Sequence, residues 1–552
     1  MPRKPITRAL VALVLVACVA GVALLAFSGS DESSGGTKNA AAGTAKSGGT
    51  LVYAVPAVPE ILDSFPYGGD GTRWLNITLN SQLIDYDTSK LQDAGCGKVA
   101  SSADVRGNLA ESYTVSPDRS SITLKLHDTR SAYGNPLTAE DVKWSFARIL
   151  ALGSFMANTL GANGHYDLDD FVNVVDPHTV RINIKQPFSF EVALLTNNLL
   201  TVWDSTEARK HATAKDPWAT KWMATHTADF GPWQLESFTP GSEIILKRNP
   251  NYTLTRGNVD RVVMRAVPDS SVRTQLLTAG DADITARLSY DEYKQLTTVD
   301  GVKVQKCVSP NRDYLILNHK EPALSKPDVR RAISLAIDRQ ALVDSAYQGY
   351  GAPARYGLSQ FIDFPKPAES GQLQYDPEKA KQLLAAAGYP DGFQLNLLYS
   401  AVRPGSVVMQ SAPVIQSMLA KVGIKVKLRN VAGGTDFYKS YSEGNYEAVL
   451  YSEGSPLSDP TYSASTFLKT GGNDNTFGYS SKQFDKTLAD AKALTVGPEQ
   501  QKLLAQLSQI SVDDVSIVFL VDQASVVPMR SSLSGYQARP QGEVVPSDLS
   551  KG

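Results

Sequence analysis

The chain has 552 residues, of which 42% are hydrophobic and 20% charged, with a formal net charge of −2 and a pI of about 6.4. This length predicts roughly two to four domains, and the lack of a basic surplus argues against a nucleic-acid partner. The histidines show no H-E-x-x-H spacing, and the glycines form neither a G-x-x-x-x-G-K-[ST] loop nor a strand-linked G-x-G-x-x-G turn. The sequence therefore offers no zinc-hydrolase, ATPase or dinucleotide motif, and we expect no metal and no cofactor.

Residues 1–27 have the pattern of an export signal. Three basic residues within the first eight positions precede an uncharged apolar run of 19 residues, from Ala9 to Phe27. Leu15-Val16-Ala17-Cys18 is similar to a bacterial lipobox, which predicts lipidation of Cys18. The run is also long enough to cross a bilayer once as a helix. A lipid anchor, an uncleaved membrane anchor and a released protein therefore stay open, and each places the rest of the chain outside the cytoplasm.

Residues 28–48 contain small and polar residues and no large apolar side chain. Such a segment buries too little surface to fold, so we expect a flexible tether. A tether after a membrane anchor lets a folded body reach a partner on the same membrane. No later apolar run is long enough to span a bilayer, which argues against a permease.

Strands are predicted along the whole body by alternating or β-rich runs. In the segment from Ser121 to Leu126, for example, Ile122, Leu124 and Leu126 share one face. The other predicted strands are Thr50–Val55, Tyr113–Val115, Val180–Ile184, Arg261–Val267, Tyr314–Leu317, Leu395–Tyr399 and Ile424–Leu428, with a strand pair inside 231–252.

Helices are predicted between these strands by apolar residues at helical spacing and by capping residues. Thr138 is expected to cap a helix that carries Val142 and Phe146, and Asp328 to cap one that carries Val329 and Ile333. The other predicted helices are Ser271–Ala279, Pro377–Ala387, Val414–Val422, Phe484–Leu494 and Gln500–Ile510. Strands that alternate with helices predict an α/β fold class.

Two cysteines, Cys96 and Cys307, lie outside the targeting segment. In an exported protein they are expected either as one disulfide or as two unpaired thiols, because the spacing alone does not give their separation in space. No C-x-x-C pair is present, so neither a zinc ribbon nor a redox motif is supported.

Several segments, in this order, resemble the bacterial extracellular solute-binding proteins of family 5, which bind peptides or nickel for ABC importers. The resemblance covers about residues 48–530, and its most specific block runs from Leu109 to Phe146. The other segments that carry it are 48–52, 231–233, 248–252, 280–284, 317–318, 329–332, 336–339, 375–377, 386–389, 416–424 and 458–460.

The resemblance implies a bilobal, periplasmic-binding-protein-like fold of type II, the large class with an extra inserted subdomain, and a hinge between the lobes. Lobe I would combine 49–85, 200–306 and 525–552. The inserted subdomain would be 86–199, and lobe II 307–524. Solute would lie between the lobes, and closure would signal to the permease.

The family pattern places the stretch Ser452-Glu453-Gly454-Ser455-Pro456 beside the ligand. Several relatives carry an aspartate four residues before the proline of the Asp459-Pro460 pair, where it neutralises the ligand's amine, and this chain has Pro456 there. Glu453 is close enough to substitute, although a solvent-exposed carboxylate is the favoured interpretation. For Asp459 itself, capping of the local turn is favoured over ligand contact.

Four further residues are candidate ligand contacts by position. Arg403 suits a ligand carboxylate, Arg287 and Asp70 lie in segments that face the cleft in relatives, and Trp74 offers an apolar wall. The competing interpretations are a surface residue for the arginines and core packing for Trp74.

The leading hypothesis is a monomeric substrate-binding subunit that captures a peptide or similar solute and serves an ABC permease and ATPase. An oligosaccharide-binding importer subunit and an extracellular peptide-sensing receptor are the alternatives. A hydrolase is disfavoured because no G-x-S-x-G motif is present, so we expect no enzyme.

Overall fold

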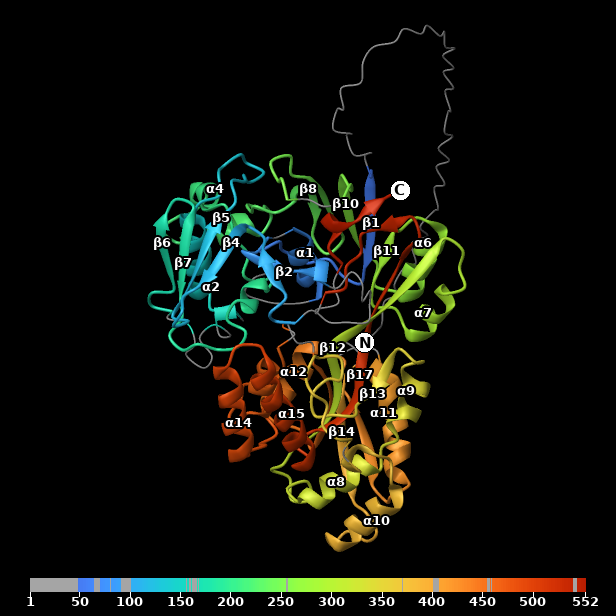
Figure 1. The fold of residues 1–552 in the computed structure, drawn as a ribbon. Helices are drawn as coiled ribbons and strands as arrows, with labels where there is room; N and C mark the ends of the chain where they lie inside the picture. Colours follow the sequence, from blue (N-terminus) through green and yellow to red (C-terminus); the bar gives the residue numbers. More distant parts are fainter. Residues whose placement is uncertain are drawn as a thin grey trace, which may run out of the picture. The chain divides into compact units, whose positions relative to one another are not determined.

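The computed structural model describes residues 48–63, 70–79, 81–90, 101–154, 156–157, 160, 166, 168–254, 257–369, 371–400, 407–453, 457, 459–539 and 544–552. The chain divides into two compact units, residues 1–45 and 46–552. The fold below is that of the described residues of the second unit (Figure 1).

One large mixed sheet organises this unit. Its strand order is β15-β14-β16-β12-β17-β11-β1-β10-β9-β8, and β13 pairs with β17 off this path. β1 is parallel to β10 and β11, and β14 is parallel to β15 and β16. The bounds are β1 Thr50–Val55, β8 Trp233–Thr239, β9 Glu243–Arg248, β10 Arg261–Ala266, β11 Ile284–Thr285, β12 Val302–Leu317, β13 Gly351–Pro353, β14 Gln394–Tyr399, β15 Lys425–Asn430, β16 Ala448–Glu453 and β17 Val518–Arg530.

A two-stranded ribbon of β12 and β17 joins the two halves of this sheet (Figure 1). We call β1 with β8–β11 the first half and β14–β16 the second half. The ribbon pairs antiparallel from Val302↔Arg530 to Leu315↔Val518, and its register shifts between Val308 and Arg312. Before the shift β17 also pairs with β11, and after it β12 pairs with β16. The chain therefore passes from one half to the other, and back, through this ribbon.

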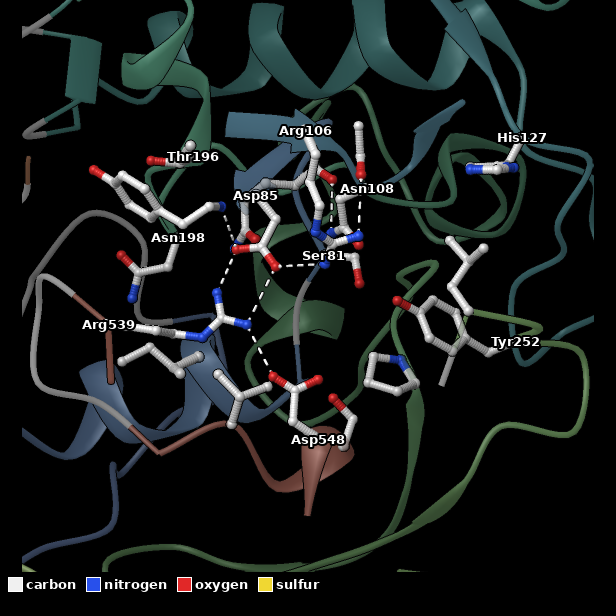
Figure 2. A pocket seen from close by; sticks show the side chains of 18 residues that line it. Ser81, Asp85, Arg106, Asn108, His127, Thr196, Asn198, Tyr252, Arg539 and Asp548 are labelled. Carbon is white, nitrogen blue, oxygen red and sulfur yellow. Dashed lines mark hydrogen bonds and ion pairs between the residues drawn. The ribbon is translucent and has the colours of Figure 1, made fainter. Parts of the chain in front are cut away.

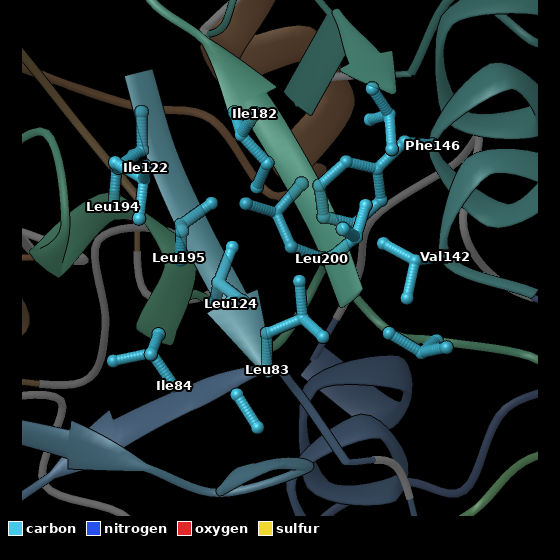
Figure 3. Packing of buried hydrophobic residues seen from close by; sticks show 14 of the residues in the cluster. Leu83, Ile84, Ile122, Leu124, Val142, Phe146, Ile182, Leu194, Leu195 and Leu200 are labelled. Atoms are coloured by element: carbon cyan, nitrogen blue, oxygen red, sulfur yellow. The ribbon is translucent and has the colours of Figure 1, made fainter. Parts of the chain in front are cut away.

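A separate four-stranded antiparallel sheet has the order β4-β5-β7-β6, with β4 Ala110–Val115, β5 Ser121–Leu126, β6 Val172–Asp176 and β7 Thr179–Asn183. Helix α2 (Ala139–Ala151) covers it, and Figure 3 shows Phe146 of the helix close to Ile182 of the sheet. The predicted cap is confirmed, because Thr138 donates its backbone N–H to Asp141 Oδ2 at 2.9 Å in a capping box. Two short pairs complete the strands: β2 (Ile84–Tyr86) with β3 (Val105–Gly107), and β18 (Leu533–Ser534) with β19 (Ser550–Lys551).

Helices cover the sheet faces, and their apolar residues supply most of the core of the second half. Their bounds are α1 Asp70–Leu79, α4 Ser205–Lys210, α5 Thr220–Met223, α6 Ser270–Ala279, α7 Tyr290–Leu296, α8 Pro327–Leu335, α9 Arg339–Ala346, α10 Pro377–Ala386, α11 Val407–Ala420, α12 Gly434–Ser442, α13 Pro460–Ser463, α14 Lys482–Ala493 and α15 Pro498–Asp513, with short 3₁₀ or π turns η3 Ala193–Thr196, η4 Gly371–Leu373, η5 Ala464–Leu468 and η6 Pro546–Asp548.

Three of the predicted elements differ from the structure. Asp328 does not cap α8, because the N-cap is Lys326 and Pro327 takes the first helical position, where its missing N–H costs nothing. The helix predicted from Val414 begins at Val407 and contains Pro413. The strand predicted at 314–317 is the end of the much longer β12, whose first part is rich in polar residues.

Candidate functional site

The carboxyl ends of two parallel strands meet where the ribbon crosses between the halves. β14 ends at Tyr399, β16 ends at Glu453, and β12 runs antiparallel beside β16 with Asp313 opposite Ser452. In open α/β sheets ligands bind beyond the carboxyl ends of the strands. This edge is therefore the candidate solute site.

Asp313 is a buried carboxylate at this edge, with 2% of its surface exposed. It accepts hydrogen bonds from the hydroxyls of Tyr347 at 2.5 Å and Ser452, and from Nε2 of Gln523 at 2.7 Å. All three donors are neutral, and no ion pair to Asp313 is formed among the described residues. Burial raises the pKa of Asp313, and the three hydrogen bonds oppose that shift. Ser452 and Gln523 are half-buried, so they lie between this carboxylate and the surface.

Tyrosines from both halves stack beside Asp313. Tyr290 belongs to α7, close to β11, whereas Tyr347 and Tyr350 follow α9 beside the second half. The rings of Tyr290 and Tyr350 are stacked with centroids 5.4 Å apart, and those of Tyr290 and Tyr347 are 5.8 Å apart. The negative charge of Asp313 also helps to raise the pKa of Tyr290, after burial, which is the larger cause. The junction thus has an aromatic wall that both halves build.

Beside Asp313, Arg312 is paired with a carboxylate, whereas burial raises the pKa of the carboxyl group of Glu453. Arg312 donates Nε to Asp522 at 2.5 Å and its two Nη groups to the carbonyls of Tyr356 and Leu358 at 2.9 and 2.8 Å. Burial alone would lower the pKa of Arg312, but Asp522 raises it. Glu453 accepts a hydrogen bond from the Tyr314 hydroxyl and is 6% exposed. The expectation of a solvent-exposed Glu453 is therefore wrong, since its side chain lies against Tyr314 under the sheet edge.

Helix α13 contacts the region that holds the four-stranded sheet. Asp459 caps this helix by accepting from the Thr461 N–H at 2.8 Å, as the sequence predicted, and its other oxygen accepts from Ser102 Oγ at 3.0 Å. Ser189 and Thr461 share a hydrogen bond of 2.9 Å between their hydroxyls. Tyr462 joins the apolar core of the four-stranded sheet, edge-on to Phe190 at 5.6 Å. Asp459 thus links α13 to the region of residues 101–199.

A sequence model of the bacterial extracellular solute-binding proteins, family 5, matches residues 104–475, which include Asp313, Ser452 and the whole of α13. The chain belongs to this family. It is the substrate-binding component of an ABC importer, and its family consists of extracytoplasmic solute-binding proteins rather than enzymes.

Curated relatives extend over most of this solute-binding protein. The probable D,D-dipeptide-binding periplasmic protein DdpA of Escherichia coli is 30% identical over 502 residues, covering 90% of this chain and 92% of the relative. The heme-binding protein A of Haemophilus influenzae is 26% identical and covers 98% and 97%. The glutathione-binding protein GsiB of Salmonella typhi is 28% identical and covers 79% and 84%.

Solved structures share the fold. The binding protein DppA of Helicobacter pylori with the peptide STSA has a TM-score of 0.73 at 23% identity, covering 91% of this chain and 98% of that one. The dipeptide-binding protein of Pseudoalteromonas with Met-Leu has a TM-score of 0.76 at 20% identity, covering 91% and 100%. The solute-binding protein therefore has the bilobal type II fold, with the hinge that the resemblance implied.

Some of the predicted ligand contacts lie within the described residues, and others lie outside them. Ser452 and Glu453 end β16 at the junction, and Asp459 lies at the α13 contact. Arg287 is exposed, has a left-handed φ of 53°, and its carbonyl accepts from Arg273 at 2.8 Å. The backbones of Asp70 and Trp74 lie in α1, but their side chains are outside the description, as are all of Arg403 and Gly454. The ligand roles of all eight residues stay predictions.

The targeting segment and one predicted disulfide partner also lie outside the described residues. These predictions concern Cys18, the anchor of residues 1–27 and Cys96. Cys307 is 1% exposed and disulfide-bonded, so the alternative of an unpaired thiol is wrong for this cysteine, and its pairing with Cys96 stays a prediction. Within the described residues, no helix is long and apolar enough to cross a membrane, and no three metal-binding side chains gather.

Asp313, Gln523 and the three tyrosines were missed by the sequence analysis. Asp313 is 139 residues from Ser452 and 210 residues from Gln523 along the chain. Only strand pairing brings these groups together. A usable signal was the acidic residue within the β-rich run Arg312 to Leu317, because a charge there is unusual for a central strand.

Proposed function

We propose that the chain captures a peptide or a similar medium-sized solute between its lobes, at the carboxyl ends of β14 and β16. It would present the closed form to an ABC permease as an anchored monomer. In this proposal lobe I is 49–85, 200–306 and 525–552, the inserted subdomain is 86–199, and lobe II is 307–524. The names of DdpA and GsiB support a peptide-like solute.

The observation that carries the proposal is Asp313. A buried carboxylate that has only neutral donors is costly, and a ligand ammonium group would lower that cost. The tyrosine rings beside it would suit a sugar, but they pack against one another. The carboxylate therefore favours peptides over the oligosaccharide alternative.

The test is thermal unfolding of residues 48–552 with di- to pentapeptides, their N-acetylated forms, oligosaccharides and metal ions. A ligand at ~100 times its dissociation constant adds about 2.7 kcal/mol of stability. We expect a rise in melting temperature with free-amine peptides and a smaller one with N-acetylated peptides.

Asp313→Asn is the matched variant, because it keeps one acceptor oxygen and removes the charge. We expect it to lose the free-amine preference, whereas Asp391→Asn, an exposed aspartate, should behave as the wild type. A rise with oligosaccharides alone would overturn the peptide proposal. A peptide response that is unchanged in Asp313→Asn would keep the peptide but remove Asp313 from the site.

A further inference from the structure

A cavity of about 170 Å³ shares no lining residue with the junction (Figure 2). Its walls come from the β2–β3 pair, the segments around Asn198 and Tyr252, and the C-terminal segment 545–548. One water needs about 10–15 Å³ of such space, so the cavity has room for roughly ten waters or for one small solute.

The charged groups of this cavity balance one another. Arg539 bridges both acids: it pairs with Asp85 and donates to Asp548 at 3.0 Å, while Arg106 reaches Asp85 at 3.2 Å (Figure 2). Two arginines and two aspartates sum to zero formal charge. An ionic ligand would therefore enter without a free counter-charge, which makes its desolvation unfavourable.

Neutral polar groups form much of the remaining wall. The amides of Asn108 and Asn198 and the hydroxyls of Ser81 and Ser547 line it. Amides and hydroxyls both donate and accept hydrogen bonds, as the hydroxyls of a ligand do. In addition, Nε of Arg539 is buried and has no acceptor among the described residues. A buried donor without a partner indicates a missing ligand or water.

An apolar side completes the cavity. Tyr252, Leu254, Pro232 and Ile77 present a ring and aliphatic carbons to the same space. Sugars and cyclic polyols combine a ring of hydroxyls with C–H faces, and such faces pack on aromatic and aliphatic side chains.

From this combination we infer a second binding site, for an uncharged polyhydroxylated solute of monosaccharide size. It is independent of the solute that the lobes enclose. Asn198 is its most direct probe, because no described hydrogen bond uses its side-chain amide, so that its replacement should leave the fold intact.

The test is isothermal titration of the full chain, purified in detergent, with D-glucose, D-galactose, D-mannose and myo-inositol, and with acetate and glycine betaine as charged probes. We expect one neutral probe to bind with a dissociation constant below about 1 mM. Asn198→Leu should weaken it at least ten-fold, because an apolar side chain with the same number of heavy atoms replaces the amide. Asn430→Ala, at an exposed position on β15, should leave it unchanged.

Three outcomes would overturn the inference. Binding of no neutral probe below 10 mM would mean that the cavity holds only water. Tighter binding of acetate or betaine would contradict the charge argument. Unchanged binding by Asn198→Leu would place the sugar elsewhere, including between the lobes. Peptides should still raise the melting temperature of Asn198→Leu, which would show that the solute site between the lobes is intact in this variant.

Discussion

Buried acids in this protein differ in how their charge is compensated. Asp522 faces Arg312, and Asp63 faces the fully buried Arg148. Asp229, by contrast, accepts from the Gly231 N–H at 2.7 Å and lies near a second acid, Asp204. Burial, with a smaller effect of Asp204, raises the pKa of Asp229 to about 7. Asp229 is therefore a destabilising group at neutral pH.

Asp229→Asn should remove a pH dependence of stability. Between about pH 4 and 7 the unfolded state releases this proton while the folded state keeps it, so the stability of the wild type falls as pH rises through this window. The expected slope approaches about 1 kcal/mol per pH unit. Urea unfolding from pH 4.5 to 8 measures it, and the variant should be the more stable protein at pH 8.

The exposed Asp281→Asn variant is the control for that comparison. Parallel stability curves for the wild type and Asp229→Asn would show that Asp229 stays ionised in the folded protein.

The long-range contacts and the burial of single residues were the hardest features to predict from the sequence. The capping role of Asp459 was correct because it depends on the next two residues. Its second bond, to Ser102, spans 357 positions and no local pattern indicates it. Glu453 was expected at the surface, but its carboxylate accepts a hydrogen bond from the Tyr314 hydroxyl on the neighbouring strand and is buried.

Elements were predicted better, because their signals are local. Apolar alternation placed β5 and β14 to within a residue, and Gly280 ends α6 with a left-handed φ of 87°. Most of β12 was not predicted, and the reason is physical. Its first part is a ribbon strand between the halves, where polar residues such as Lys303 and Gln305 alternate with valines, and such a strand needs no continuous core.

The capping box of α7 should be worth about 1 kcal/mol. Ser289 accepts from the Glu292 N–H at 3.3 Å, and the Ser289 N–H donates back to Glu292 at 2.6 Å. Ser289→Ala should lower the free energy of unfolding by that amount. Because Tyr290 follows directly, the variant should also weaken any peptide response. Gln295→Ala, at an exposed position of the same helix, should do neither. Urea titrations of both variants give the comparison, and equal midpoints would mean that the cap contributes nothing.

At the scale of the molecule, the parts of the chain meet at the β12–β17 ribbon, at the stack of Tyr290 with Tyr347 and Tyr350, and at α13. The β12–β17 ribbon is held by backbone hydrogen bonds on both sides of its register shifts. The contact at α13 is made by side chains: Asp459 with Ser102, Thr461 with Ser189, and Tyr462 with Phe190. Side-chain contacts of this kind are easily broken, whereas the ribbon can only bend at its register shift. The α13 contact is therefore the one that lobe opening would release.

The double variant Ser102→Ala, Ser189→Ala should shift the protein toward the open state. It removes both hydroxyls opposite α13 but leaves the Asp459 cap and the Tyr462 packing in place. Two hydrogen bonds of about 1 kcal/mol each correspond to roughly a thirty-fold change in the opening equilibrium. Fluorescence energy transfer between labels on the exposed surfaces of β6 and α14 should show a larger population at long distance, and bound peptide should dissociate faster. Ser345→Ala, on the exposed side of α9, is the control. An unchanged distance distribution in the double variant would mean that the ribbon alone sets the closed state and that the α13 contact follows closure without stabilising it.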